Sequence, residues 1–394
     1  MTKKAVLAFS GGLDTSVVVK YLQEDHDMDV ITVTVDVGQG DDYKTITAKS
    51  KQLGAKKHYH IDAKKEFVTD YIFPSIKANA LYEKKYCLAT ALARPLIAKK
   101  LLDIAKKEKV DVLAHGCSGK GNDQVRFDIT MRAGSNLPII APIRDLNLDR
   151  PTELKFASKR GIKIDNVAKK YSIDQNLWGR AIEGGDLENP YNEPKDDAFI
   201  WVKTKNLPKN PTRMEITFEK GIPIKVDGKA MSPISLIQYI NKKAGNAGVG
   251  IIDHIEDRVV GIKSREVYET PAALCLIEAH QDLEKMVHTK HQNKFKSIID
   301  DEWAYLVYSG LWEDPLRDNL EGFINQSQKN VSGTVRLRLF QGSLRVTGRK
   351  SEHSLYSHDT ATYGESTFDQ KLARGFVELW GMQSTEANKL QKKR

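Results

Sequence analysis

Between residues 4 and about 160, short apolar runs alternate with longer segments whose apolar positions recur at helical spacing. The short runs predict strands at residues 5–9, 30–35, 57–61, 110–114 and 138–141. The longer segments predict helices at residues 16–23, 43–53, 67–81, 89–107 and 124–132. Strands that alternate with helices indicate βα units around a parallel sheet, so we expect an α/β nucleotide-binding domain with a doubly wound parallel sheet.

The regular alternation ends near residue 165, and a loop-rich stretch follows. Hairpin signals then predict strands at residues 214–218, 222–226 and 335–339, and helical spacing predicts helices at residues 271–287, 295–311 and 369–382. The Lys/Arg-rich end after residue 382 is expected to be disordered. We therefore expect three parts, which are the first domain over residues 1–165, an α+β domain over residues 166–362, and a C-terminal helix with a basic tail over residues 363–394.

The composition restricts the class of protein. Of the 394 residues, 40% are hydrophobic and 29% are charged, which argues against disordered, collagen-like and membrane proteins. No segment approaches the roughly 18 apolar residues that a membrane helix needs. Cysteine occurs only at positions 87, 117 and 275, an odd count without paired spacing, which predicts neither a disulfide framework nor a zinc site and favours a reducing cytoplasm.

The net charge is +9, from 61 basic and 52 acidic residues, and it suggests an anionic partner. Nucleic acid is one candidate. An enzyme that handles phosphates and carboxylates is another, and a lysine-rich solvated surface accounts for most individual lysines.

The first predicted strand runs directly into the segment SGGLDTS at residues 10–16. Two glycines let the backbone approach an anion, hydroxyls flank them, and the following helix presents free N–H groups and its positive dipole end. The spacing matches neither the Walker A motif nor the GxGxxG fingerprint. The segment predicts a phosphate loop, with a Gly-Gly turn and a serine cap as the structural alternative.

The fourth predicted strand ends in AHGCSGKGNDQVRF at residues 114–127. Ligands of open α/β sheets bind outside the carboxyl ends of the strands, so this loop and the phosphate loop are expected to share a site. The loop offers the hydroxyl of Ser118, the amide of Asn122, the carboxylate of Asp123 and the guanidinium of Arg126. This mixture suits a zwitterionic amino acid, and helix capping with a surface salt bridge is the alternative for any one residue.

The phosphate loop resembles the pyrophosphate-binding loop of the ATP pyrophosphatases. Together with five further blocks, it makes the chain resemble the argininosuccinate synthase family over nearly its whole length. The six blocks lie at residues 8–16, 86–98, 114–127, 171–185, 250–271 and 306–316. The resemblance implies an ATP pyrophosphatase-type first domain, a synthetase and multimerisation domain after it, and a homotetramer in which the C-terminal helix reaches across subunits.

The resemblance also implies the reaction. The family joins L-citrulline to L-aspartate with ATP in arginine biosynthesis, through a citrullyl-AMP intermediate, and releases AMP and pyrophosphate. The ureido oxygen of citrulline is a weak nucleophile and its carbon resists attack by an amine, so adenylation must come first. Neither step requires a covalent enzyme nucleophile, and positioning and charge stabilisation are expected to supply most of the rate.

The family's contacts, carried over by position, form three sets. The ATP contacts are Ala8, Phe9, Ser10, Gly11, Gly12, Leu13, Asp14, Thr15, Ser16, Val35 and Gly116. The aspartate contacts are Ser118, Asn122 and Asp123. The citrulline contacts are Tyr86, Ala91, Asn122, Arg126, Ser172, Ala181, Glu256 and Tyr268. Many members carry serine where Ala91 and Ala181 stand, so this chain lacks those two hydroxyls.

Ser10 and Asp14 are the expected catalytic residues. Ser10 would help to hold pyrophosphate. Asp14 is too acidic to donate a proton at neutral pH, so we expect it to position Mg²⁺ or water. No metal site made by protein side chains alone is expected.

Two other functions stay open at this point. The net charge favours an RNA-modifying ATP pyrophosphatase, although the sulfur-transferring enzymes of that kind need a reactive cysteine pair, and Cys87 and Cys117 lie in blocks explained otherwise. A non-catalytic adenine-nucleotide sensor is compatible with the expected fold. Our preferred partners are ATP, citrulline and aspartate, with no nucleic acid and no membrane.

Overall fold

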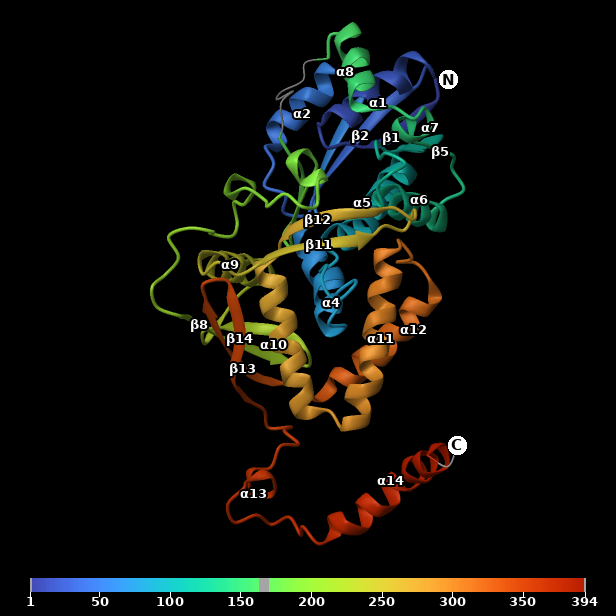
Figure 1. Ribbon diagram of the computed structural model, residues 1–394. Coiled ribbons are helices and arrows are strands. Elements are labelled where there is room, and N and C mark those ends of the chain that lie inside the picture. The colour runs from blue at the N-terminus through green and yellow to red at the C-terminus, as the bar shows by residue number, and fades with distance from the viewer. Residues whose placement is uncertain (1, 163–169, 393–394) are drawn as a thin grey trace.

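Five parallel strands form the sheet predicted for the first part of the chain (Figure 1). In the computed structural model, which describes residues 2–162 and 170–392, these strands stand in the order β3-β2-β1-β4-β5. Their bounds are Lys4–Ala8 (β1), Asp29–Asp36 (β2), Lys57–Asp62 (β3), Val112–Ala114 (β4) and Ile139–Ile140 (β5). All five predicted strands are confirmed, whereas the expected boundary between residues 165 and 166 lies outside the described residues.

Helices cover both faces of this sheet. Their bounds are Leu13–Glu24 (α1), Tyr43–Gln52 (α2), Lys64–Glu66 (α3), Phe73–Lys77 (α4), Ala89–Glu108 (α5), Asp123–Gly134 (α6), Pro142–Asp145 (α7) and Arg150–Lys159 (α8). Val6, Ile31 and Val33 pack in one cluster with α5, while Ala5 and Leu7 pack in another with α1. Burial on both faces explains why the strands are almost continuously apolar.

The helix predicted over residues 67–81 is wrong in detail. A π-helical turn, η1 (Phe67–Ile72), precedes α4, which ends at Lys77. Pro74 lies in the first turn of α4, where its missing N–H is tolerated. In the middle of one continuous α-helix the same proline would remove a backbone hydrogen bond, so a π-helical turn precedes it instead.

Two antiparallel sheets follow. The first has the order β11-β12-β7-β6, with bounds Ser172–Gln175 (β6), Arg180–Glu183 (β7), Ile251–Asp257 (β11) and Lys263–Glu269 (β12), and none of these four strands was predicted. The second has the order β10-β9-β8-β13-β14, with bounds Thr212–Glu219 (β8), Ile222–Val226 (β9), Lys229–Ala230 (β10), Gly333–Phe340 (β13) and Ser343–Lys350 (β14). Both predicted hairpins belong to this second sheet.

Four longer helices accompany the two sheets. They are α9 (Pro233–Asn246), α10 (Pro271–Val287), α11 (Lys290–Tyr308) and α12 (Pro315–Ser327), with short turns η2 (Gly185–Glu188), η3 (Asp196–Ala198) and η4 (Gln328–Asn330). The prediction matches α10 and places α11 five residues late, because Thr289 and Gln292 form a capping box that starts the helix earlier. None of the helices in the described ranges is long and apolar enough to cross a membrane.

A buried ionic cluster joins α10 and α11 to the segment after α4. Lys296 is 2% exposed, and its Nζ lies 2.7 Å from Asp300 Oδ1 and 3.0 Å from Glu284 Oε1. Asn79, which follows α4, donates to both carboxylates, and its oxygen lies 2.6 Å from His280 Nδ1. Charges buried this deeply are tolerated only when they are paired and hydrogen-bonded.

The C-terminal segment lies apart from the rest of the chain (Figure 1). It contains α13 (His358–Ala361) and α14 (Leu372–Gln391), and α14 has no buried residue. The expectation of disorder after residue 382 is therefore wrong as far as Gln391. The charged and polar residues of this stretch are exposed to solvent, but most of them still favour a helix. Residues 393–394 are outside the described part.

Candidate functional site

The segment SGGLDTS forms a tight turn between β1 and α1. Gly11 adopts a left-handed conformation with φ +76°, which glycine reaches without strain. Gly12 is the N-cap of α1 and makes no side-chain cap, so the first N–H groups of the helix remain available to an anion. Ser16 Oγ donates to the Gly12 carbonyl at 2.6 Å, and Ser10 Oγ accepts from Gly12 N at 3.3 Å. The serine-capped alternative therefore does not describe this turn.

The ATP positions expected around this turn differ in exposure. Ser10, Gly12 and Asp14 are exposed, whereas Phe9 and Leu13 are buried in the core under the loop. Val35 is buried in β2 and offers only backbone groups to a ligand. Lys49 of α2, which the sequence did not single out, donates to the Gly11 carbonyl at 2.7 Å.

The loop after β4 lies against the phosphate loop. A Cβ added to Gly116 would lie 3.1 Å from Thr15 Cγ2 and 3.4 Å from the carbonyl carbon of Asp14. This close approach follows from the pairing of β1 with β4 at the centre of the sheet, where the strand order reverses direction. The two loops that the sequence assigned to one site are therefore neighbours.

A buried carboxyl accompanies Asp14. Glu153 of α8 is 5% exposed, and its Oε2 is a buried atom without a hydrogen-bond partner. Burial, together with the nearby charge of Asp14, raises the pKa of Glu153 to about 8. Glu153 could not be singled out from the sequence, because nothing in the pattern of α8 sets it apart from surface glutamates.

Asp123, at the start of α6, is held by two guanidinium groups. Arg94 Nε lies 2.8 Å from Asp123 Oδ2, and Arg126 Nη1 lies 3.0 Å from Asp123 Oδ1. Burial would raise the pKa of Asp123, but the charges and hydrogen bonds of the two arginines outweigh it and hold the pKa below its usual value. Asp123 is thus an ionised, half-buried acceptor.

The sheet that contains β11 and β12 presents one face to this loop. Strand register pairs Tyr268 with Ala181 and Ala181 with Asp174. Alternation along the strands then puts four expected citrulline positions on the same face, which are Ser172, Ala181, Glu256 and Tyr268. Asp174 on this face pairs with Arg94, which ties the sheet to the first domain.

Glu256 is the buried acceptor on that face. It is 3% exposed and accepts from Tyr268 Oη at 2.8 Å and from Tyr308 Oη at 2.5 Å. Burial alone would raise the pKa of Glu256, but the contacts with His254, Tyr308 and Tyr268 lower it. Tyr86 stacks on Tyr268 with ring centroids 4.4 Å apart, so a residue of the first domain closes the aromatic side of the site.

The structure brings six of the expected amino-acid contacts into one cluster, in which Asp123 is half-buried and the other five are buried, namely Tyr86, Asn122, Arg126, Glu256 and Tyr268. Ser118 and Ser172 are exposed at its rim. Ala91 is fully buried in α5, and its methyl group belongs to the core. The assignment of these residues to citrulline and aspartate stays a prediction.

Sequence analysis missed three residues of this cluster. Thr90 Oγ1 lies 2.7 Å from Tyr86 Oη and accepts from Arg126 Nη1 at 3.2 Å. Arg94 pairs with Asp123, and Tyr308 contacts both Asn122 and Glu256. All three lie inside blocks that were matched to a family, but only long-range contacts show what they touch.

The described ranges contain no group of three or more His, Cys, Asp or Glu side chains that could hold a metal ion. The three cysteines are free, and Cys87 and Cys275 are buried. Burial raises the pKa of the Cys87 thiol to about 12 and also raises that of Cys117, so neither is a thiolate at neutral pH.

Comparison with known proteins covers nearly the whole chain. The family model described as "Arginosuccinate synthase N-terminal HUP domain" matches residues 4–163, and that described as "Arginosuccinate synthase C-terminal domain" matches residues 171–387. The argininosuccinate synthase of Pyrococcus furiosus is 54% identical over 98% of this chain and 94% of its own length. Those of Dictyoglomus turgidum and Methanothermobacter thermautotrophicus are 50% and 51% identical, each over 97% of this chain and 96% of its own.

Proposed function

The chain belongs to the argininosuccinate synthase family, and on that premise we propose that it is an ATP-dependent ligase that joins L-citrulline to L-aspartate in arginine biosynthesis. The observation that carries the proposal is the 50–54% identity to argininosuccinate synthases along almost the full length of both proteins. The chemistry is adenylation of the citrulline ureido oxygen, followed by displacement of AMP by the amine of aspartate.

The phosphate loop binds the triphosphate of ATP in this proposal. The uncapped N–H groups at the start of α1 and the hydroxyl of Ser10 hold the pyrophosphate that leaves. Gly116 and the backbone near Val35 complete the nucleotide site from the neighbouring strands. The support is the adjacency of these loops at the centre of the sheet.

The amino acids occupy the buried cluster beside that loop. The carboxylate of Asp123 and the amide of Asn122 suit the ammonium and carboxylate groups of aspartate, with Ser118 at the rim. Arg126, Glu256 and Tyr268 suit the charged end of citrulline, and the stacked rings of Tyr86 and Tyr268 exclude water. Without hydroxyls, Ala91 and Ala181 contribute packing or backbone contacts only.

Mg²⁺ accompanies ATP in this proposal. The ion commonly takes one or two carboxylates from a protein and its other ligands from phosphates and water, so a site without a protein-only cluster is suitable. Asp14, exposed on the phosphate loop, is the carboxylate that would hold the ion, which supplies charge neutralisation for the departing pyrophosphate. Ser10 and the α1 N–H groups orient the phosphate oxygens.

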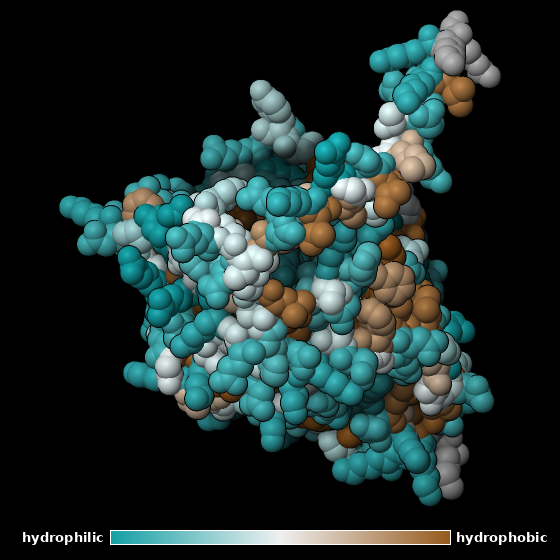
Figure 2. All heavy atoms as spheres, turned by 90° about the horizontal axis from the view of Figure 1, so that it is seen from below, coloured by the Kyte–Doolittle hydropathy of each residue, from teal (hydrophilic) through white to brown (hydrophobic). Residues whose placement is uncertain are grey.

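The active assembly is a homotetramer in the cytoplasm, according to this proposal. The support for assembly is α14, whose apolar side chains Phe376, Val377, Leu379 and Trp380 are 57–74% exposed. The face seen in Figure 2, on the side where α13 and α14 lie, carries several apolar patches. A helix whose apolar side chains stay exposed on its own chain suits a surface of another copy. Free cysteines, of which Cys87 and Cys275 are buried, suit a reducing compartment.

A product assay tests the function. The purified protein is incubated with ATP and Mg²⁺, and AMP and pyrophosphate are measured after addition of citrulline, aspartate, both amino acids, or transfer RNA. We expect sustained release of both products only with the amino-acid pair. Release driven by transfer RNA would favour the RNA-modifying alternative, and ATP binding without release would favour the nucleotide sensor.

A further inference from the structure

Tyr308, the last residue of α11, connects residues that the proposed function assigns to different substrates. Its side chain is fully buried. Its hydroxyl accepts from Asn122 Nδ2 at 2.8 Å and donates to Glu256 Oε1 at 2.5 Å. Asn122 comes from the loop after β4 and Glu256 from β11, so one hydroxyl joins the two domains at the substrate cluster.

The backbone of the same residue holds Arg126. The Tyr308 carbonyl accepts from Arg126 Nε at 3.2 Å and from Nη2 at 3.0 Å. Carbonyls in the last turn of a helix have no partner within the helix and carry its negative dipole end, which favours a guanidinium. Arg126 Nη1 remains with Asp123 and Thr90, so the whole guanidinium is fixed.

The hydroxyl contacts also determine how the Asn122 amide is oriented. Because the phenol gives its one proton to the Glu256 carboxylate, it can only accept from Asn122, which places Nδ2 toward Tyr308. Asn122 Oδ1 then accepts from the Val259 backbone N–H at 2.9 Å. One N–H and one lone pair of the amide are left for a ligand, so Asn122 can serve a carboxylate and an ammonium group at once.

Burial and the charge of Glu256 raise the pKa of Tyr308, so the phenol keeps its proton at working pH. The hydroxyl also lies 3.1 Å from the Asp257 carbonyl. This carbonyl is a second acceptor to which the proton can turn when a ligand ammonium engages Glu256.

We propose that Tyr308 is a positioning residue of the ligase, whose hydroxyl couples the citrulline side of the site at Glu256 to the side shared with aspartate at Asn122. The proposal rests on the proposed function. Tyr308 is not among the expected substrate contacts. If the proposal is right, the affinities for citrulline and for aspartate both depend on the Tyr308 hydroxyl.

The ring of Tyr308 has a separate structural role. It stacks on Tyr82 with centroids 3.5 Å apart and meets Tyr86 edge-on at 6.1 Å. Phenylalanine would keep this packing and remove only the hydroxyl, so Tyr308→Phe separates the positioning role from packing. Tyr305→Phe is the matched control, because Tyr305 lies on the same helix with a ring that is 52% exposed.

Steady-state kinetics on the full-length enzyme test the proposal. In Tyr308→Phe we expect the KM values for citrulline and for aspartate each to rise about tenfold or more, since hydrogen bonds to charged groups are worth that much. ATP affinity, measured by equilibrium binding without amino acids, should stay within about twofold of wild type. Tyr305→Phe should match wild type in all three. Unchanged KM values for both amino acids in a folded Tyr308→Phe enzyme would overturn the proposal.

A double-mutant cycle with Glu256→Gln separates coupling from general damage. If Tyr308 acts through Glu256, the two substitutions together should raise the citrulline KM by clearly less than the product of the single effects. Independent, multiplicative effects would contradict the coupling.

If the Tyr308→Phe protein does not fold, a second measurement tests the proposal. Glu256→Gln alone should then raise the aspartate KM as well as the citrulline KM, because Tyr308 transmits the change to Asn122. An effect confined to citrulline would overturn the proposal. If the wild-type protein releases no pyrophosphate with both amino acids, the proposed function is wrong. If the wild-type protein does turn over and the Tyr308→Phe enzyme has the same KM values, only the role of Tyr308 is wrong.

Discussion

Gly310 lies against the backbone of Arg126, so that a Cβ atom at Gly310 would stand 3.1 Å from both the Cα and the nitrogen of Arg126. Gly310 follows α11 with φ +78°, in the left-handed region. The C-terminal end of α11 can approach α6 this closely only because Gly310 has no side chain. The contact is what allows the Tyr308 carbonyl to reach the Arg126 guanidinium.

Gly310→Ala is therefore expected to displace Arg126. We expect a lower thermal midpoint, since the left-handed conformation alone costs a non-glycine residue about 1–2 kcal/mol, and a higher KM for citrulline. Gly322→Ala is the control, because Gly322 lies in α12 with no atom near its added Cβ. That substitution should leave the kinetics unchanged and stabilise the protein slightly. Wild-type citrulline KM in Gly310→Ala would show that the contact does not position Arg126.

The phosphate loop supplies a second prediction. Ser10→Ala and Asp14→Asn should each lower kcat by about 10²-fold or more, as loss of a preorganised group at a developing charge does. Both residues are exposed, so the thermal midpoint should change little. Pyrophosphate release is measured after equilibrium dialysis has shown that ATP binds. Ser297→Ala, at an exposed position of α11, is the control, and wild-type turnover in both loop variants would refute their assignment as catalytic residues.

The buried cluster around Lys296 gives a prediction about stability. Lys296→Met leaves Glu284 and Asp300 without their shared cation, and breaking a buried ion pair on one side costs about 3–5 kcal/mol. Urea unfolding should show this loss of unfolding free energy. Lys294→Met, at an exposed position of the same helix, should change stability by less than about 0.5 kcal/mol. Equal effects of the two substitutions would mean that the cluster is not stabilising.

Asp128 gives a prediction about pH. Its Oδ1 lies 2.7 Å from His115 Nε2 and its Oδ2 lies 3.0 Å from Arg144 Nη1. Burial would raise the pKa of Asp128, but these partners outweigh it and lower the pKa. A carboxyl with a lowered pKa in the folded state stabilises the fold above its unfolded pKa of about 3.9, and this stabilisation is lost as the pH falls through the folded pKa.

Asp128→Asn should accordingly be less stable than wild type at pH 7, by about 1–3 kcal/mol. The difference should persist to about pH 5 and shrink on further acidification. Unfolding free energies from pH 7 to pH 3 measure it, with Asp103→Asn at an exposed position of α5 as the control. A difference that grows on acidification would contradict the sign of the pKa shift.

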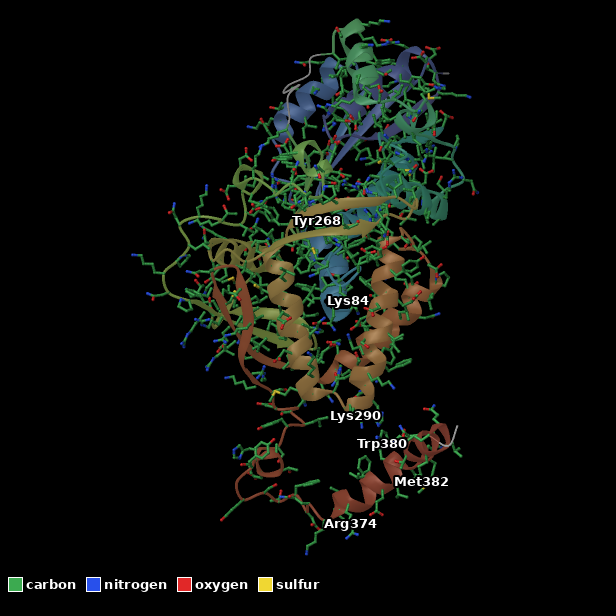
Figure 3. The ribbon with its side chains drawn as sticks, viewed as in Figure 1. Lys84, Tyr268, Lys290, Arg374, Trp380 and Met382 are labelled. Atoms are coloured by element: carbon green, nitrogen blue, oxygen red, sulfur yellow. The ribbon has the colours of Figure 1, made fainter. Side chains whose placement is uncertain are left out.

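The C-terminal segment gives a prediction about assembly. Removal of residues 363–394 should reduce the particle mass measured by light scattering, because the exposed apolar residues of α14 would no longer contact another copy. The remaining chain should still unfold in one cooperative thermal transition, since α14 buries no residue against its own chain. Lys290 Nζ of α11 lies over the Trp380 ring of α14, 5.6 Å from its centroid (Figure 3). Glu378→Gln, on the same helix, is the control, and an unchanged particle mass after truncation would refute the role in assembly.

The first sheet could be predicted because its strands are buried on both faces. A run such as residues 30–35 is apolar or β-branched throughout, and glycine-rich loops mark where the strands end. The sequence could also assign the loops after the first and fourth strands to one site, but the pairing of β1 with β4 that brings Gly116 against the phosphate loop is known only from the structure.

The hairpin of β11 and β12 could not be found in this way. Its site-facing positions include His254, Glu256 and Glu266, so polar side chains occupy the face whose apolar residues normally signal a strand. Local charge in this hairpin reflects its place in the substrate cluster. Because polar residues occupy the site-facing positions of β11 and β12, the alternating apolar pattern that would predict these strands is absent.

Tyr308 illustrates another limit. It lies 186 residues from Asn122 in the chain, and its side chain looks like that of any core tyrosine in a helical pattern. Its contacts depend on how α11 ends against α6, which no local periodicity encodes. Arg94 and Glu153 were missed for the same reason.

The central position of β1 has a consequence for synthesis of the chain. The first strand pairs with β4, and the Lys4 backbone N–H donates to Asp111 Oδ2, 107 residues later. At roughly 5–20 residues per second, a ribosome needs several seconds or more to deliver that partner. Until then one edge of β1 is unpaired, so nascent chains are exposed to strand-to-strand aggregation in this interval, and the phosphate loop cannot acquire its final shape before β4 has left the ribosome.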